Sequence, residues 1–473
     1  MAKNINNAQL VVVIGGGPGG YEAALQARAY GAQAVLIENQ GPGGSAVLTD
    51  VIPSKTLIAS AAWMDNVSRA RELKIAEEGD ASYKADLLGI FERVSRLAND
   101  HSTEIANRLR DAGVQVISGT GQILAETCEN GRRIVTVKED PSQRFEADVV
   151  LLATGARPRE LPDAKPDGKR ILTWKQIYSL KEVPQHLIVV GSGVTGAEFA
   201  AAFNSVGVRV TLVSSRDRVL PNNDPDAAEL IQRVFESNGV EIRGNARADA
   251  ARVEGDKVIV TLGDGSEIEG SHVLMAVGAI PNTDGIGLEE AGVELNERGF
   301  IVTDRVSRTT ANRIYAAGDC TGVFLLASVA AEQGRIAMAH ALGDAVEPLR
   351  LDQICSNIFT NPEIAAVGVT QAQVDLGEVD CVQMMLPVHR NARAKMRGIN
   401  EGFVKIFARR NTRAIAGAVL CLQYAGEFIF PITLAVKNRL TVDEFASTFT
   451  VFPSISGTIT ETARQLHKRV EDY

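Results

Sequence analysis

One structural unit occurs twice in this chain and restricts its fold more than any other feature: a strand, a glycine-rich turn, a helix and a second strand. In the first copy the apolar run Leu10–Ile14 leads into the turn, a helix-forming stretch follows, and Ala34–Ile37 forms the second strand. The turn lets the backbone approach a pyrophosphate at the helix N-terminus, and Glu38 is placed to accept hydrogen bonds from a ribose. The residues of this copy expected to bind a dinucleotide are Gly15, Gly17, Pro18, Gly20 and Glu38.

The second copy starts 176 residues later, with the apolar run His186–Val190, a helix over Ala197–Val206 and the strand Arg209–Val213. Two such units imply two dinucleotides, and one chain that holds both most simply passes electrons between them. This copy ends in a serine followed by arginines. These groups suit the 2′-phosphate of NADPH, which a carboxylate would repel, so we expect NADPH with NADH usable, unless the arginines are ordinary surface residues. The residues expected to bind the nicotinamide nucleotide are Gly191, Gly193, Val194, Gly196, Ser214, Ser215 and Arg216.

Composition argues against several kinds of partner. Of 473 residues, 45% are apolar and 23% charged, which is ordinary for a globular protein. A net charge of −9 without a basic block makes nucleic acid and anionic membrane surfaces poor partners. The chain has neither a signal-peptide pattern nor an apolar run near the roughly 18 residues of a membrane span, so we expect no stable membrane insertion. Five scattered cysteines without a CxxC pair favour a cytoplasmic protein with no disulfide framework and no metal site.

Further apolar runs that end in glycine lie between and after the two units, and the segment Gly41–Lys55 reads GPGGSAVLTDVIPSK. This ordered set resembles the flavoprotein disulfide reductases, the family of lipoamide dehydrogenase and glutathione reductase, over about Gln9 to Leu466. The resemblance implies an α/β fold with two Rossmann-like dinucleotide-binding domains, for FAD and NAD(P), and an α+β C-terminal dimerisation domain. The implied boundaries are 1–158 and 281–350 for the FAD domain, 159–280 for the NAD(P) domain and 351–473 for the dimerisation domain.

The resemblance also implies roles for single residues. Lys55 matches the lysine beside the flavin ring, and Glu198 matches its ionic partner near the nicotinamide, so these two are the expected catalytic residues. A cation at the ring favours its electron-rich reduced form. Asp319 matches the acid that binds the ribityl and phosphate region of FAD. The other positions implied to contact FAD are Gly44, Ser45, Thr154, Gly155, Gly278, Gly318, Leu326 and Ala327.

The sequence departs from this family where the sulfur chemistry takes place. The two redox-active cysteines of relatives are replaced by Ala46 and Val51, neither of which can form the thiolate that disulfide exchange requires. Where relatives carry a histidine–glutamate pair that serves the partner subunit's active site, this chain has Phe452 and Gly457. Neither residue can move or orient a proton. Electrons are therefore expected to leave the flavin directly for an outside acceptor.

The expected function is a homodimeric NAD(P)H:quinone oxidoreductase, because a flat two-electron acceptor such as a quinone needs no thiol. The chain is also similar to the thiol-less, lipoamide dehydrogenase-like quinone reductases of bacteria, and dihydrolipoamide dehydrogenase activity is expected to be absent. Two alternatives stay open: a soluble pyridine nucleotide transhydrogenase and a non-catalytic FAD-binding interaction protein. Phe359 and Phe452 either stack on a substrate ring or fill the core, and the core is the favoured interpretation.

Overall fold

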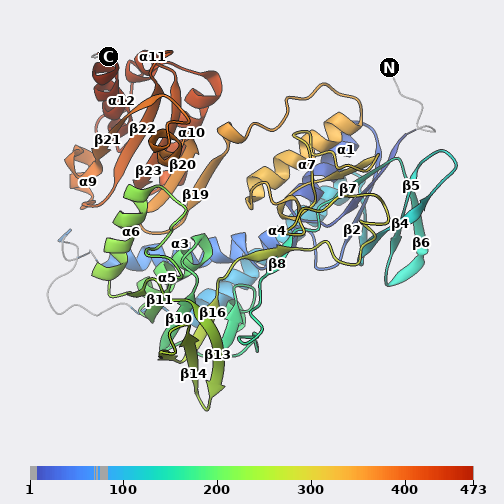
Figure 1. The fold of residues 1–473 in the computed structure, drawn as a ribbon, viewed down its shortest axis with the longest axis horizontal. Helices are drawn as coiled ribbons and strands as arrows, with labels where there is room; N and C mark the ends of the chain where they lie inside the picture. Colours follow the sequence, from blue (N-terminus) through green and yellow to red (C-terminus); the bar gives the residue numbers. More distant parts are fainter. Residues whose placement is uncertain (1–7, 69, 71–72, 75–83, 472–473) are drawn as a thin grey trace. The chain divides into compact units, whose positions relative to one another are not determined.

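The structure, a computed structural model, describes residues 8–68, 70, 73–74 and 84–471 (Figure 1). The chain forms two compact units, each built from three segments. The first unit comprises Met1–Thr56, Phe91–Arg159 and Gly278–Arg350, and the second comprises Leu57–Ile90, Glu160–Val277 and Leu351–Tyr473. Within the described residues, no helix is both long enough and apolar enough to cross a membrane.

The first unit is built on a parallel sheet of five strands in the order β18-β7-β1-β2-β3. The strands are β1 Leu10–Ile14, β2 Gln33–Glu38, β3 Gln115–Ser118, β7 Val149–Leu152 and β18 Ile314–Ala316. Apart from the edge strand β3, they are mostly apolar and buried, as a parallel sheet covered on both faces requires. The two strands predicted in the first nucleotide unit are confirmed.

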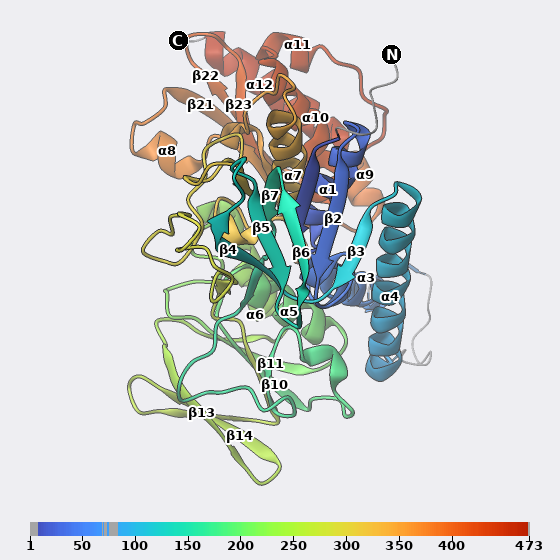
Figure 2. The same ribbon diagram turned by 90° about the vertical axis from the view of Figure 1, so that its right-hand side faces the viewer.

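Helices cover one face of this sheet and a second sheet covers the other (Figure 2). The remaining elements are α1 Pro18–Ala29, α2 Gly44–Leu48, α3 Val51–Ser68, α4 Leu87–Asp111, α7 Ala327–Ala341, η3 Asp319–Thr321, β4 Gly121–Thr127, β5 Arg133–Val137, β6 Asp140–Ala147, β8 Ala156–Pro158 and β17 Ala279–Pro281. Helices α1, α4 and α7 pack on one face, and the antiparallel strands β4–β6 pack on the other. Helix α3 belongs to this unit as far as Thr56, and α4 joins it at Phe91.

The second unit repeats this plan with a parallel sheet in the order β12-β11-β10-β16-β9. The strands and helices of this part are β9 Ile171–Thr173, η2 Ile177–Ser179, β10 His186–Val190, α5 Val194–Ser205, β11 Arg209–Val213, α6 Pro225–Ser237, β12 Glu241–Arg243, β13 Ala248–Glu254, β14 Lys257–Leu262, β15 Glu267–Gly270 and β16 His272–Met275. The antiparallel strands β13–β15 contribute to the core on one face of the sheet. Strands β10 and β11 have the predicted bounds.

The C-terminal part of the second unit is an antiparallel sheet in the order β19-β20-β23-β22-β21 with helices packed against it. Its elements are η4 Leu351–Gln353, β19 Cys355–Ile358, β20 Glu363–Gly368, α8 Gln371–Asp375, β21 Cys381–Pro387, η5 Val388–Arg390, α9 Ala392–Met396, β22 Phe403–Arg409, β23 Ile415–Leu422, α10 Ala425–Asn438, α11 Val442–Ala446 and α12 Ser456–Glu471. One expectation is wrong here: Phe452 is 87% exposed, so it does not fill the core of this chain. Phe359 is half-buried.

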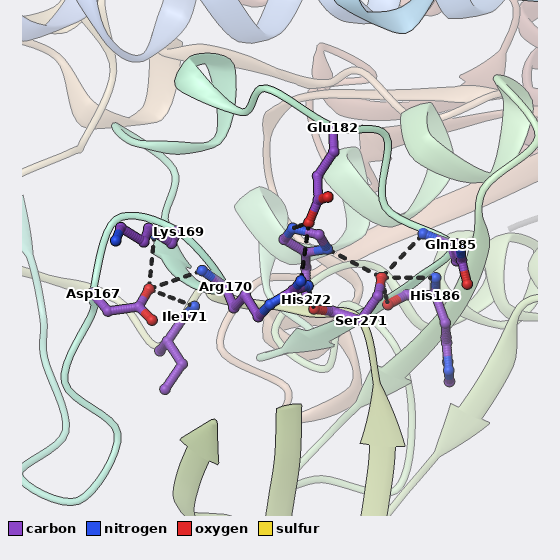
Figure 3. A network of polar contacts seen from close by, with 9 residues as sticks. All are labelled: Asp167, Lys169, Arg170, Ile171, Glu182, Gln185, His186, Ser271 and His272. Atoms are coloured by element: carbon purple, nitrogen blue, oxygen red, sulfur yellow. Dashed lines mark hydrogen bonds and ion pairs between the residues drawn. The ribbon is translucent and has the colours of Figure 1, made fainter. Parts of the chain in front are cut away.

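A polar network lies at the amino-terminal edge of the second parallel sheet (Figure 3). The Ser271 hydroxyl accepts hydrogen bonds from the backbone N–H groups of Gln185 and His186 at 3.0 and 3.1 Å, and donates to the His186 carbonyl at 3.0 Å. The His272 ring is buried, with Nδ1 3.0 Å from the Ser271 hydroxyl and Nε2 3.6 Å from a carboxylate oxygen of Glu182. The network therefore fixes the starts of two central strands.

We expect His272→Gln to reduce the loss of stability of the protein in mild acid. Burial and then the charge of Arg170 lower the pKa of His272 below its usual 6.5, against the opposing charges of Glu182 and Asp167. The unfolded chain binds a proton below about pH 6.5 that the folded chain resists, so stability falls as the pH drops through this value. Melting temperatures of the flavin-loaded protein between pH 7.5 and 5 measure the effect. The exposed His101→Gln is the control, and parallel curves for wild type and His272→Gln would refute the prediction.

Candidate dinucleotide-binding sites

Four residues predicted to bind FAD lie at one edge of the first parallel sheet. Gly15 follows β1, Glu38 ends β2, Thr154 lies two residues after β7, and Asp319 lies three residues after β18. The strands pair in parallel register, so their carboxyl ends meet at this edge. Ligands of open α/β sheets bind outside the carboxyl ends of the strands.

The first glycine turn is packed so closely that only glycine fits at two of its positions. Gly15 has a φ of +103°, and a Cβ there would lie 2.2 Å from the Ala153 carbonyl oxygen. A Cβ on Gly20 would lie 1.8 Å from the Gly15 carbonyl oxygen. A Cβ on Gly17, the N-cap of α1, would in contrast meet no atom of the described chain within 4 Å. The turn thus leaves open space at a helix N-terminus, where backbone N–H groups and the helix dipole attract a pyrophosphate.

The acid at the end of β2 already accepts backbone hydrogen bonds. One oxygen of the Glu38 carboxylate accepts the N–H of Gln40 at 2.6 Å, and the other accepts the N–H of Gly16. These contacts hold the carboxylate against the glycine turn. Gly44 approaches the same turn, because a Cβ on it would lie 2.9 Å from the Gly17 Cα.

Two polar groups at this edge fit a ligand that carries hydroxyl groups. The Thr154 hydroxyl is buried and has no hydrogen-bond partner among the described residues. Burial, and then the charge of Asp50, raise the pKa of Asp319 to about 6. Buried polar groups are normally hydrogen-bonded, so both side chains fit the ribityl hydroxyls and phosphates of FAD. Leu326 is the N-cap of α7 and Ala327 is its first residue, and their contact with FAD stays a prediction.

We expect Asp319→Asn to stabilise the flavin-free protein at pH 7.5 and to weaken FAD binding. A pKa raised from 3.8 to about 6 means that the ionised carboxylate lowers the free energy of unfolding by up to about 3 kcal/mol. This cost disappears as the pH falls from about 6 towards 4, where the folded protein binds a proton before the unfolded chain does. Urea unfolding of the flavin-free protein and FAD titration measure the two effects. The exposed Asp100→Asn is the control, and a destabilised flavin-free Asp319→Asn would contradict the prediction.

The two positions that carry cysteines in the family lie on the short helix α2 and on the longer helix α3 that follows it. Ala46 lies within α2 and Val51 begins α3, and both are half-buried. Lys55 follows Val51 by one helical turn on α3. All five cysteines of the chain are free, and burial raises the pKa of the Cys320 thiol to about 11, so it stays protonated at neutral pH.

The second glycine turn repeats the steric pattern of the first. Gly191 has a φ of +110°, and a Cβ there would lie 2.2 Å from the Ala276 carbonyl oxygen. A Cβ on Gly196 would lie 1.8 Å from the Gly191 carbonyl oxygen, whereas one on Gly193 meets no described atom within 4 Å. Val194 is the first residue of α5. The second unit therefore offers the same open helix N-terminus to a second pyrophosphate.

Glu198 lies on α5 and is buried, with 3% of its surface exposed. Its carboxylate accepts the backbone N–H of Phe359 at 2.9 Å, a contact that no local pattern in the sequence indicates. Phe359 also lines a cavity with residues of α3 and α5 in the same unit. Lys55 belongs to the first unit and Glu198 to the second, and their pairing stays a prediction.

The residues predicted to select the nicotinamide nucleotide differ in exposure. Ser214 is fully buried directly after β11, while Ser215 and Arg216 are exposed. The Ser214 hydroxyl lies 2.7 Å from the hydroxyl of Ser192, a residue that sequence reasoning passed over although it lies inside the second glycine turn. Among the described residues, no cluster of three or more His, Cys, Asp or Glu side chains could hold a metal ion.

Two glycine turns of matching build, each at the carboxyl edge of a parallel sheet, define an α/β protein with two dinucleotide-binding units. The chain belongs to the pyridine nucleotide-disulphide oxidoreductase family. Residues 9–334 match the model of that family, and residues 354–463 match the model of its dimerisation domain. The family resemblance and the fold class predicted from the sequence are thereby confirmed, and the chain is an oxidoreductase.

Known relatives cover nearly the whole chain. An NAD(P)H dehydrogenase (quinone) of Mycobacterium tuberculosis is 50% identical over 461 residues, which is 96% of this chain and 93% of the relative. A dihydrolipoyl dehydrogenase of Chlamydia muridarum is 32% identical over 461 residues, or 97% of each chain. The crystal structure of LpdA from Mycobacterium tuberculosis has a TM-score of 0.92 at 50% identity, with 97% of this chain and 100% of that chain covered.

Proposed function

We propose that this protein is an FAD-dependent NAD(P)H:quinone oxidoreductase that works without dithiol chemistry and lacks dihydrolipoamide dehydrogenase activity. The observation that carries the proposal is the pair Ala46 and Val51 on α2 and α3, at the positions where related enzymes carry the reactive sulfurs. The 50% identity to a protein named NAD(P)H dehydrogenase (quinone) supports it.

Within this function each group of residues has one task. Bound FAD would supply the two-electron chemistry. Gly15 and Gly20 permit the tight turn, Gly17 leaves room for the pyrophosphate, and Lys55 provides the positive charge that favours an electron-rich ring. Ala46 and Val51 leave an apolar, sulfur-free surface for a flat acceptor. We assign 1–158 and 281–350 to FAD binding, 159–280 to the nicotinamide nucleotide and 351–473 to dimerisation.

We further propose that the protein is a cytosolic homodimer. The match to the dimerisation domain supports a dimer, as do large apolar side chains that the single chain leaves exposed: Phe430, Leu434, Phe449, Val451 and Phe452. In a dimer, Phe452 would replace the acid–base histidine that relatives present to the partner's active site. Five free cysteines fit a reducing compartment. Sedimentation velocity of the flavin-loaded protein tests the dimer, and a monomer at micromolar concentration would exclude it.

The function is tested by anaerobic reduction with NADPH followed by a panel of acceptors. We expect NADPH to bleach the flavin band and menadione to be reduced faster than oxygen, while lipoamide gives no measurable turnover. Oxidation of NADPH no faster with menadione than with oxygen alone would overturn the proposal. Reduction of thionicotinamide-NAD⁺ without quinone, at the rate of menadione, would identify a transhydrogenase instead. A flavin that NADPH fails to bleach would identify a non-catalytic protein.

The chain offers a test variant and a matched control variant for this assay. Gly193→Ala adds a methyl group where the described chain leaves open space, so the fold should persist while the pyrophosphate of NADPH is obstructed. Ser237→Ala makes a change of similar size at the exposed end of α6. Menadione reduction should be lost in Gly193→Ala and kept in Ser237→Ala.

A further inference from the structure

In both nucleotide units a polar contact joins the glycine turn to the end of the second strand, but the groups that form it differ. In the first unit the Glu38 carboxylate accepts the N–H of Gly16. The equivalent positions 176 residues later are Ser214 and Ser192, whose hydroxyls lie 2.7 Å apart in a buried contact. Two neutral hydroxyls therefore replace a backbone–carboxylate bridge, and the negative charge at the end of the strand is lost.

The hydrogen-bond capacity of Ser214 is fully used within the chain. Its hydroxyl donates to the Arg218 carbonyl at 3.0 Å and accepts the Arg216 backbone N–H at 3.1 Å. A serine hydroxyl has one proton and two lone pairs, and the Ser192 hydroxyl, which lies 2.7 Å away and 3.4 Å from the Arg218 carbonyl oxygen, is the third partner of Ser214. Ser214 is also 0% exposed. It can shape the turn that follows but has no group left for a nucleotide.

The turn that Ser214 shapes is held from two further sides. The backbone N–H of Leu220 donates to the Ser192 carbonyl at 2.8 Å, and that of Asn245 donates to the Arg216 carbonyl at 2.7 Å. These bonds fix the backbone of the turn on the glycine loop and on the strand-end segment after β12.

The turn leaves one arginine available at its surface. The Arg218 guanidinium lies 3.2 Å from the Asp217 carboxylate, which offsets its charge. Arg216 is exposed and forms no ion pair within the described residues. A guanidinium of this kind binds phosphate strongly, and the carboxylate that would repel a 2′-phosphate is missing from the end of β11.

We propose that Ser192 is a positioning residue for nucleotide selection: its hydroxyl locks Ser214, which holds the 214–218 turn so that Arg216 meets the 2′-phosphate of NADPH. The inference rests on the proposed function, because it takes a nicotinamide nucleotide as the electron donor. It replaces the expectation that Ser214 itself contacts the nucleotide.

The test is a double-mutant cycle measured by calorimetric titration of the flavin-loaded protein with NADP⁺ and NAD⁺. Loss of the Ser192 hydroxyl in Ser192→Ala should weaken NADP⁺ binding about 10-fold and change NAD⁺ binding less than about twofold. In the Arg216→Ala background the same substitution should have no further effect on NADP⁺ binding, because the group it positions is gone. Ser192→Thr keeps the hydroxyl and should restore most of the preference for NADP⁺.

Equal weakening of both nucleotides by Ser192→Ala would overturn the inference, since that is the result of general damage to the glycine turn. An undiminished 10-fold effect in the Arg216→Ala background would also overturn it. The titrations need no electron acceptor. If menadione is not reduced, the proposed function is refuted, but the nucleotide preference can still be measured. The two failures are therefore distinguishable.

Discussion

Lys405→Met is expected to lower the free energy of unfolding of the protein by about 3–5 kcal/mol, the cost of breaking a buried ion pair on one side. Lys405 lies within β22 and is 1% exposed. Its ammonium group is 3.0 and 2.8 Å from the two carboxylate oxygens of Asp224, and it also bonds Asp226 and, at 3.3 Å, Gln371. Without the lysine, the Asp224 carboxylate, itself 5% exposed, would be left buried without its cation.

Lys405→Met would also affect the start of α6, because Asp224 is the N-cap of that helix. Its side chain accepts the backbone N–H groups of Asp226 and Ala227, both at 3.2 Å. Urea unfolding of the flavin-loaded protein, followed by far-UV circular dichroism, measures the change.

Two controls separate the charge from general damage. The exposed Lys181→Met should change the free energy of unfolding by less than about 0.5 kcal/mol. Lys405→Met combined with Asp224→Asn should recover part of the loss, because asparagine keeps the cap and leaves no buried charge. An exposed ion pair contributes at most about 1 kcal/mol. If the free energy of unfolding of Lys405→Met lies within that amount of the wild-type value, the buried ion pair does not stabilise the protein.

Lys55→Met is expected to slow the reduction of the bound flavin by NADPH about 100-fold, in line with the removal of one preorganised electrostatic group from an active site. Lys55 lies on α3 four residues after Val51, and the family resemblance puts it beside the flavin ring. A methionine of similar length removes the charge that favours the reduced ring. The flavin midpoint potential should fall as well, because the reduced form loses more stabilisation than the oxidised form.

Anaerobic stopped-flow absorbance gives the rate of flavin reduction, and a redox titration gives the potential. FAD content and NADP⁺ affinity should stay within about twofold of the wild type, since the interaction acts mainly in the transition state. Lys55→Arg should recover part of the rate, and Lys138→Met, at an exposed site of the same unit, should change neither quantity. A normal rate with a normal potential in Lys55→Met would remove Lys55 from the catalytic residues.

Secondary structure was predictable where its cause is local. The strands Leu10–Ile14, His186–Val190 and Arg209–Val213 have their predicted bounds, because each is a short β-branched run that ends at a glycine or a loop. Helix α4 was missed although its buried residues recur at helical spacing: Leu87, Phe91, Val94, Ala98, Ile105 and Leu109. The antiparallel sheets of β4–β6 and β13–β15 were missed too, since their alternating strands carry no motif.

The sequence by itself determined the two nucleotide-binding turns. The reason is steric and short-ranged for Gly20 and Gly196, because the carbonyls of Gly15 and Gly191 in the same turns leave no room for a Cβ. The absence of sulfur at Ala46 and Val51 is likewise a property of the sequence alone.

Only the tertiary structure decided which polar groups meet. Glu198 accepts a hydrogen bond from a backbone group 161 residues away, and Lys405 is buried against Asp224, 181 residues away. The Ser214 hydroxyl meets that of Ser192, which lies on a different strand end, and accepts the backbone N–H of Arg216. A buried charge or hydroxyl is satisfied by whichever groups the packed sheets bring within about 3 Å, and those distances depend on elements far apart in the chain.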